Sequence, residues 1–203
     1  MEKYVYDFSE GNRDLKDLLG GKGANLAEMT NLGLPVPPGF TITTDACRTY
    51  MQTSMLPPEV RVQVTMALRR LEDSLGRLLG DTHDPLLVSV RSGAKFSMPG
   101  MMETVLNVGL NDASVEGLAT FAGDARFAWD SYRRLIQMFA KTVLGIDGDL
   151  FSNALDAKKK ARGVSGDTDL PAEDLHELVD EFKAIVKAES GRDFPQQPRE
   201  QLD

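Results

Sequence analysis

Apolar residues along this chain follow two spacings, and each spacing predicts a different kind of element. Short runs rich in aromatic and β-branched residues predict strands over residues 3–8, 40–43, 86–91 and 104–108. The third of these runs is almost continuously apolar, which is typical of a strand buried on both faces. Apolar residues at helical spacing predict helices over residues 14–19, 22–32, 57–79, 113–120, 125–144, 148–160 and 171–188.

The order of these elements predicts an α+β fold in two parts. Residues 1–111 combine strands with helices, and we expect a small mixed β-sheet there. Residues 112–203 show helical spacing only, and we expect an all-helical part. Its last residues, Gly191–Asp203, are polar and carry two prolines, so they are expected to fray. Thr44 is placed to cap the helix that follows the strand at 40–43.

The composition is that of an ordinary globular protein. The 203 residues suffice for one sizeable domain or two small ones, and no apolar run is long enough for a transmembrane helix. The net charge is −8, and most of it falls in residues 163–203, where 11 acidic residues accompany four basic ones. Nucleic acid and anionic membranes are therefore poor partners, whereas one or two well-placed cations suffice for a small anionic ligand. A single cysteine, Cys47, and the lack of a secretory signal favour a cytoplasmic location.

The stretch Gly20–Leu26 is the first candidate binding site. Its glycines allow close approach of the backbone to a ligand, and a helix beginning at Lys22 or Gly23 presents N–H groups that favour a phosphate. Lys22 adds a full positive charge. The stretch is not a P-loop, because its spacing differs and Gly23 rather than serine or threonine follows the lysine. The alternative is a turn between two helices that carries a solvated lysine.

The stretch Arg91–Thr104 is the second candidate. Arg91 stands at the end of the apolar strand, where open α/β sheets tend to place ligand contacts, and a guanidinium there can hold a phosphoryl group through two hydrogen bonds. The residues after Arg91 include two glycines, three methionines and few charges, so they suit a loop that covers a ligand and excludes water. The alternative is a hairpin connection with Arg91 in a structural ion pair.

The other residues with useful chemistry favour structural roles. His83 is expected in a loop, His176 on a solvated helix face, and Cys47 in the core as a small apolar residue. Trp129 lies among apolar residues at helical spacing, which favours core packing over a cofactor role. No group of cysteine, histidine or carboxylate residues has the spacing of a zinc or calcium site.

The two candidate stretches together resemble the dikinase family, which comprises pyruvate, phosphate dikinase and phosphoenolpyruvate synthase. The resemblance is carried by Gly20–Met29, Gly33–Phe40, Asp84–Asn107 and Arg126–Met138. The Ser-Met-Pro-Gly-Met-Met form of residues 97–102 resembles the pyruvate, phosphate dikinase side of the family. Because the N-terminal domain of these enzymes has the ATP-grasp fold, the resemblance implies a partial ATP-grasp domain followed by a helical subdomain.

The resemblance also implies a phosphotransferase. Members of the family interconvert ATP, pyruvate and phosphate with AMP, phosphoenolpyruvate and diphosphate, with ATP and Mg²⁺ as the implied cofactors. The phosphoryl group passes through a histidine on a separate domain to pyruvate bound at a C-terminal barrel. Those domains are therefore the implied partners of this chain, and the full-length enzyme is expected to be a homodimer.

The family pattern assigns roles to particular residues of this chain. Lys22 and Arg91 match positions that contact the ATP phosphates, and we expect them to be catalytic as well as nucleotide-binding. The resemblance implies that the carboxylates for Mg²⁺ lie outside this chain. Glu103 is the only acid in the apolar loop and is a weak candidate for a ligand. Further nucleotide contacts are implied for Gly93, Ser97, Met98, Gly100 and Met101.

The chain departs from the family pattern in its extent. It stops at Asp203, whereas the family's adenine pocket, magnesium ligands and phosphohistidine motif follow later. We therefore expect an N-terminal piece that is inactive in isolation and binds ATP weakly. The alternative is a stand-alone helical interaction module derived from a dikinase start, with residues 112–203 as its docking surface.

Overall fold

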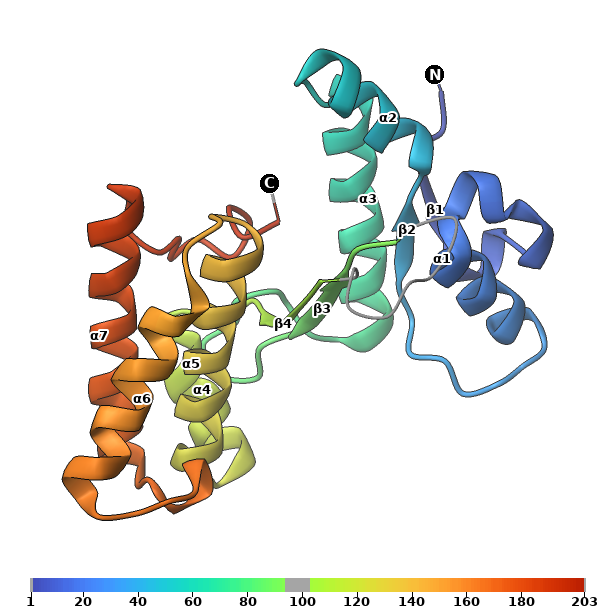
Figure 1. Ribbon diagram of the computed structural model, residues 1–203. Helices are drawn as coiled ribbons and strands as arrows, with labels where there is room; N and C mark the ends of the chain where they lie inside the picture. Colours follow the sequence, from blue (N-terminus) through green and yellow to red (C-terminus); the bar gives the residue numbers. More distant parts are fainter. Residues whose placement is uncertain (1, 94–102, 203) are drawn as a thin grey trace. The chain divides into compact units, whose positions relative to one another are not determined.

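Residues 2–93 and 103–202 are described in a computed structural model of the chain (Figure 1). The structure is mostly helical with two small sheets, so the predicted α+β class is confirmed. The strands are β1 (Val5–Asp7), β2 (Phe40–Ile42), β3 (Val88–Arg91) and β4 (Thr104–Val108). The α-helices are α1 (Lys16–Asn31), α2 (Thr44–Thr53), α3 (Pro58–Leu75), α4 (Ser114–Ala122), α5 (Ala125–Thr142), α6 (Gly148–Arg162) and α7 (Ala172–Ser190).

The chain forms two compact units. The N-terminal unit comprises Met1–Gly76 and Arg91–Glu103, and the helical unit comprises Arg77–Val90 and Thr104–Asp203. These limits differ from the predicted division between residues 111 and 112. The difference has a physical cause, since β4 contributes buried valines to the core of the helices and therefore belongs with them.

The strands form two separate two-stranded sheets, β1–β2 and β3–β4, in the described part of the chain. The expected single mixed sheet is therefore wrong for these residues. β1 and β2 are antiparallel, with Tyr6 opposite Thr41. The expectation that Leu86–Arg91 is buried on both faces is also wrong, because Val90 is 45% exposed. The apolar run indicated a strand correctly, but its far end has no second layer over it within the described residues.

Helix termini in the N-terminal unit follow local chemistry. Thr43, not the predicted Thr44, caps α2, because its side-chain oxygen accepts a hydrogen bond from the N–H of Ala46. Pro58 occupies the first turn of α3, where its missing N–H costs no hydrogen bond. α3 ends before the predicted Leu79, because Gly76 adopts the left-handed conformation that closes many helices.

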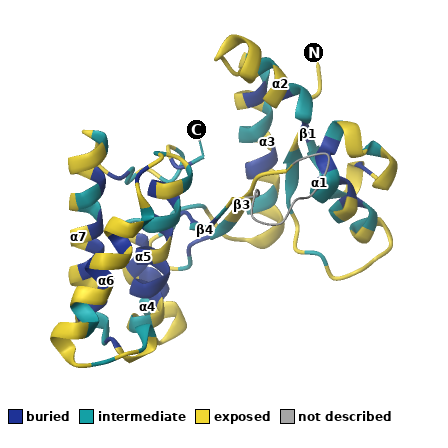
Figure 2. Cartoon of the chain, in the orientation of Figure 1, coloured by how far each residue is buried: buried dark blue, intermediate teal, exposed yellow. Residues whose placement is uncertain are grey.

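The helical unit is built around α5, whose inner face is fully buried (Figure 2). Helices α4 and α7 pack against it, and Tyr132 and Ile136 of α5 have no exposed surface. Phe151 of α6 and Phe182 of α7 meet edge to face, with ring centroids 5.0 Å apart. Each of these side chains contributes about 1.5–3 kcal/mol by burial. The core packing predicted for Trp129 is confirmed, because only 7% of this residue is exposed.

The C-terminal segment Gly191–Leu202 packs on the helical unit, so the prediction of a frayed end is wrong. Phe194 is only 2% exposed, and its ring meets that of Tyr132 edge to face. The side-chain oxygen of Gln201 accepts a hydrogen bond from the buried N–H of Gly109. A single phenylalanine among polar residues gives no periodic signal, which is why the sequence pattern indicated a disordered tail.

Within residues 2–93 and 103–202, no helix combines the length and the apolar character needed to cross a membrane.

Candidate functional site

A kink at Gly20 places Lys22 near the start of a helical segment. Gly20 has φ +69° and ψ 169°, which only glycine adopts readily, and this conformation interrupts α1. Lys22 lies in the first turn of the longer segment that continues to Asn31. The predicted break between two helices is therefore confirmed, and it explains why a glycine stands at position 20.

Gly23 has a packing role. A Cβ atom built at this position would lie 2.7 Å from the Cγ2 atom and 2.9 Å from the Oγ1 atom of Thr41 on β2. Since both atoms branch directly from the Cβ atom of Thr41, they cannot move away easily. Gly23 therefore allows α1 to lie against β2, and this contact holds the Lys22 segment on the sheet.

Lys22 reaches the second candidate stretch. Its Nζ atom donates a hydrogen bond of 3.3 Å to the carbonyl oxygen of Ser92, 70 residues further along the chain. Ser92 directly follows Arg91, the last residue of β3. The N–H and the hydroxyl of Ser92 both donate to the carbonyl oxygen of Glu103, at 3.1 and 3.2 Å. The fold thus brings the lysine segment to the backbone that carries Arg91.

Gly93 is exposed, and a Cβ atom at this position would meet nothing within 4 Å among the described atoms. The fold of the described residues therefore gives no reason for a glycine there, in contrast to Gly20 and Gly23. The other predicted loop contacts lie outside the described residues, and they are Ser97, Met98, Gly100 and Met101.

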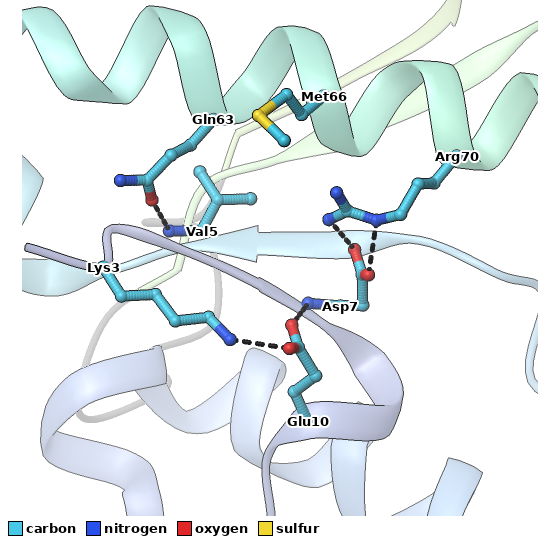
Figure 3. A pocket seen from close by; sticks show the side chains of 7 residues that line it. All are labelled: Lys3, Val5, Asp7, Glu10, Gln63, Met66 and Arg70. Atoms are coloured by element: carbon cyan, nitrogen blue, oxygen red, sulfur yellow. Dashed lines mark hydrogen bonds and ion pairs between the residues drawn. The ribbon is translucent and has the colours of Figure 1, made fainter. Parts of the chain in front are cut away.

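A cavity of about 450 Å³ lies in the N-terminal unit between α3 and β1 (Figure 3). Arg70 forms two hydrogen bonds with the carboxylate of Asp7, at 2.9 and 3.0 Å, and Lys3 pairs with Glu10 at 2.6 Å. Both ion pairs are partly solvated. The lining residues are Lys3, Val5, Asp7, Glu10, Gln63, Met66 and Arg70.

The charges in this cavity stabilise one another. Hydrogen bonding from Lys3 and the N–H of Asp7 lowers the pKa of Glu10, although desolvation opposes this effect. The hydrogen bonds to Asp7 raise the pKa of Arg70, so this guanidinium is held in its charged form. Because the cations and anions pair within the cavity, we interpret it as a structural connection between β1 and α3. These pairs span up to 63 residues, and no local sequence signal indicates them.

The predicted nucleotide residues do not line this cavity. A second cavity of about 340 Å³, beside Phe8 and Arg70, also lacks Lys22, Arg91 and Gly93 among its described lining residues. The candidate site is therefore an exposed polar junction, formed by the kinked helix and the end of β3, and it is not an enclosed pocket in the described part of the chain.

The described residues contain no group of three or more histidine, cysteine, aspartate or glutamate side chains that could hold a metal ion. Both histidines belong to the helical unit, whereas Lys22 belongs to the N-terminal unit. His83 is exposed in a loop, as predicted. His176 stacks on Trp129 with ring centroids 4.1 Å apart, so its expected solvated helix face is only part of its environment. Cys47, expected in the core, is exposed, and that expectation is wrong.

Comparison with known proteins agrees with the resemblance seen in the motifs. The family described as "Pyruvate phosphate dikinase, AMP/ATP-binding domain" matches residues 16–65, which include Lys22. The pyruvate, phosphate dikinase of Clostridium symbiosum is 53% identical over 204 residues, covering all of this chain and 23% of the relative. That of Rhizobium meliloti is 52% identical over 207 residues, with the same coverage. Pyruvate, phosphate dikinase 2 of Zea mays is 53% identical over 196 residues, covering 96% of this chain and 22% of the relative.

The similarity extends over the whole chain and concerns the N-terminal part of these enzymes, so the predicted resemblance is confirmed. The chain spans less than a quarter of the length of the curated relatives it matches.

Proposed function

We propose that this chain is the nucleotide-binding N-terminal part of a pyruvate, phosphate dikinase. The hydrogen bond from Lys22 to the backbone at Ser92 carries this proposal, because it joins the two motifs expected to hold ATP phosphates. The match of residues 16–65 to the AMP/ATP-binding domain of these enzymes supports it independently. The partial ATP-grasp fold, the cytoplasmic location and the homodimeric state of the full-length enzyme remain predictions.

Lys22 and Arg91 differ in what they offer a triphosphate. Lys22 supplies a compact charge with three donors, and Arg91 supplies a planar guanidinium that can donate two parallel hydrogen bonds to one phosphoryl group. Phosphoryl transfer depends mainly on positioning and on neutralising charge on the phosphate oxygens. In this proposal, Lys22 and Arg91 perform both tasks, and Gly93 leaves room for the nucleotide beside Arg91. Ser97, Met98, Gly100 and Met101 are proposed to exclude water from the bound phosphates.

Magnesium is part of the proposed reaction, and its carboxylate ligands are proposed to lie outside this chain. Mg²⁺ usually takes one or two carboxylates together with phosphate oxygens. Within residues 2–93 and 103–202, no three or more metal-ligating side chains come together.

The remaining chemistry is proposed to take place on other domains. The β-phosphoryl group of ATP passes to a histidine on a separate domain and the γ-phosphoryl group to inorganic phosphate, which leaves AMP and diphosphate. The phosphohistidine then gives its phosphoryl group to pyruvate at a barrel to form phosphoenolpyruvate. In this proposal the chain alone binds ATP weakly and is inactive. The alternative of a stand-alone interaction module gains no support from the C-terminal segment, which packs on its own unit through Phe194.

Replacing the two cations tests the proposal. In a full-length dikinase carrying this chain, Lys22→Ala and Arg91→Ala are each expected to lower the ATP partial reaction by about 10²–10³-fold, the cost of removing one donor to developing charge. The exchange of labelled phosphate into ATP measures this reaction without pyruvate. Unchanged exchange in both variants would remove these residues from the site.

Matched substitutions control for the loss of charge itself. Lys16→Ala changes an exposed lysine on α1 before the kink, and Arg69→Ala changes an exposed arginine on α3. Both are expected to leave the exchange rate within about twofold, because neither side chain belongs to the junction of Lys22 with Ser92. Equal losses in test and control variants would indicate a general effect of net charge.

A further inference from the structure

Ser92 lies at the centre of the contacts that join the two candidate stretches. Its carbonyl oxygen accepts the hydrogen bond from Lys22 at 3.3 Å. Its N–H and its hydroxyl both donate to the carbonyl oxygen of Glu103, at 3.1 and 3.2 Å. One residue therefore connects α1 to the end of β3 and the end of β3 to the residue before β4.

We propose that Ser92 is a positioning residue, which sets the place of Lys22 relative to Arg91 for binding of nucleotide phosphates. This inference rests on the function proposed above. Ser92 itself is not assigned a contact with the nucleotide. Its role is to fix the carbonyl group that receives the ammonium of Lys22, so that this cation is already directed toward the residue after Arg91 when ATP arrives.

The hydroxyl has a geometric task in this arrangement. A backbone N–H alone leaves the carbonyl oxygen of Glu103 with one donor, whereas the added hydroxyl gives it two donors from the same residue. Two donors on one acceptor restrict rotation of the Ser92 peptide groups more than a single donor does. Because the carbonyl of Ser92 belongs to the next peptide group, this restriction also limits where the ammonium of Lys22 can lie.

The ammonium of Lys22 can serve the backbone and a ligand together. An ammonium has three donors, and the hydrogen bond to Ser92 uses one of them. The others remain suitable for phosphate oxygens. A long lysine side chain loses considerable rotamer freedom when it is fixed, so a carbonyl that holds it before binding reduces the entropic cost of binding.

The test uses the 203-residue chain and Mg-ATP, with the dissociation constant measured from amide chemical shifts, which report weak binding. Ser92→Ala keeps the backbone and removes the hydroxyl, and we expect it to raise the dissociation constant about three- to tenfold, as for the loss of one hydrogen bond. Ser92→Thr keeps a hydroxyl and is expected to restore binding to within about twofold. Thermal unfolding of each variant measures any purely structural effect.

A double substitution separates positioning from mere stabilisation. If Ser92 acts through Lys22, the variant Lys22→Ala/Ser92→Ala binds Mg-ATP no more weakly than Lys22→Ala alone. If the two effects multiply instead, Ser92 acts independently and the proposal is overturned. It is also overturned if Ser92→Ala lowers the unfolding temperature without changing the dissociation constant.

The outcomes also distinguish this inference from the proposed function. Unchanged ATP binding in both Lys22→Ala and Arg91→Ala contradicts the nucleotide site itself. Weakened binding in those two variants, together with normal binding in Ser92→Ala, leaves the nucleotide site in place and removes only the role of Ser92.

Discussion

The helical unit and the N-terminal unit bury apolar side chains in very different ways. In the helical unit, large residues such as Tyr132, Phe151 and Phe182 are completely buried in one continuous core. Among the described residues of the N-terminal unit, several buried positions are alanines, and a small separate cluster consists of Tyr4, Ala46 and Val60. Large apolar side chains remain exposed there, including Met29, Leu32, Met51, Met55, Val62 and Met66.

Because of this difference, we link stability mainly to the helical unit and the candidate nucleotide site to the N-terminal unit. The helical unit is stabilised chiefly by its continuous apolar core, in which each large buried side chain contributes about 1.5–3 kcal/mol. The N-terminal unit relies more on polar connections, such as those of Gln63 and Arg70, and it carries the candidate nucleotide residues Lys22 and Arg91. We therefore expect substitutions in the two units to affect different measurements.

Truncating a core ring of the helical unit is expected to have the largest effect on stability. Phe182→Ala removes a fully buried side chain that meets Phe151 edge to face, and such changes cost about 3–5 kcal/mol. Denaturant unfolding measures the loss. Phe127→Ala is the matched control, because Phe127 of α5 is half-exposed, and its cost is expected to stay below about 1 kcal/mol. Equal losses of unfolding free energy in Phe182→Ala and Phe127→Ala would contradict the assignment of the core.

Filling the space at Gly23 is expected to have the next largest effect, and it falls on the N-terminal unit. In Gly23→Ala, the added methyl overlaps Thr41 and costs about 1–3 kcal/mol, while the better helix propensity of alanine returns up to about 1 kcal/mol. Amide hydrogen exchange in α1 should therefore accelerate. Gly93→Ala is the control, because a Cβ atom at this position meets no described atom, so hydrogen exchange in α1 should stay unchanged. Weaker Mg-ATP binding in Gly93→Ala would separately show that the ligand approaches this position.

Removing the amide of Gln63 is expected to have a smaller effect. Its oxygen accepts the N–H groups of Tyr4 and Val5, at 2.7 and 3.0 Å, and its nitrogen donates to the carbonyl of Glu2 at 2.6 Å. Gln63→Ala should destabilise the N-terminal unit by about 1–2 kcal/mol and speed hydrogen exchange at the two donors. Gln52→Ala, at an exposed position of α2, should leave that exchange unchanged. Equal protection in both variants would show that Gln63 does not hold β1.

The smallest expected effect is a dependence of the stability of the helical unit on pH. Hydrogen bonding from Arg162 lowers the pKa of Asp174, with bonds of 2.5 and 3.0 Å to its carboxylate. Because the pKa is lower in the folded state, the pair stabilises the fold above the ordinary pKa of aspartate and loses this contribution as the pH falls through the folded-state value. Unfolding midpoints of the parent and of Asp174→Asn should therefore differ at neutral pH and converge in acid. If the difference between the two unfolding midpoints stayed constant with pH, the ion pair of Asp174 with Arg162 would not be the cause of the pH dependence.

Local signals in the sequence predicted most elements, whereas their assembly depended on long-range contacts. The helical spacing over 125–144 and 171–188 indicated α5 and α7 closely, because these helices bury one face each. The packing of Gly191–Leu202 was missed, because it depends on Phe194 and on single side-chain contacts such as that of Gln201 with Gly109.

The sequence indicates the residue types of the candidate site, but it does not indicate the hydrogen bond between Lys22 and Ser92 that connects the two candidate stretches. The glycines and the cation indicated Gly20–Leu26, and the break at Gly20 was expected from the sequence. Nothing in the local pattern indicates that Lys22 meets the carbonyl of Ser92, since backbone acceptors have no sequence signature. For the same reason, Ser92 was not singled out.

A titration of the isotope-labelled chain with Mg-ATP tests the central claim most directly, because one spectrum observes both units. We predict shifts of the amide signals of Gly21–Gly23 and Arg91–Gly93, with the signals of α5 and α7 unchanged. Shifts confined to α5 and α7, with none at Lys22 or Arg91, would contradict the account.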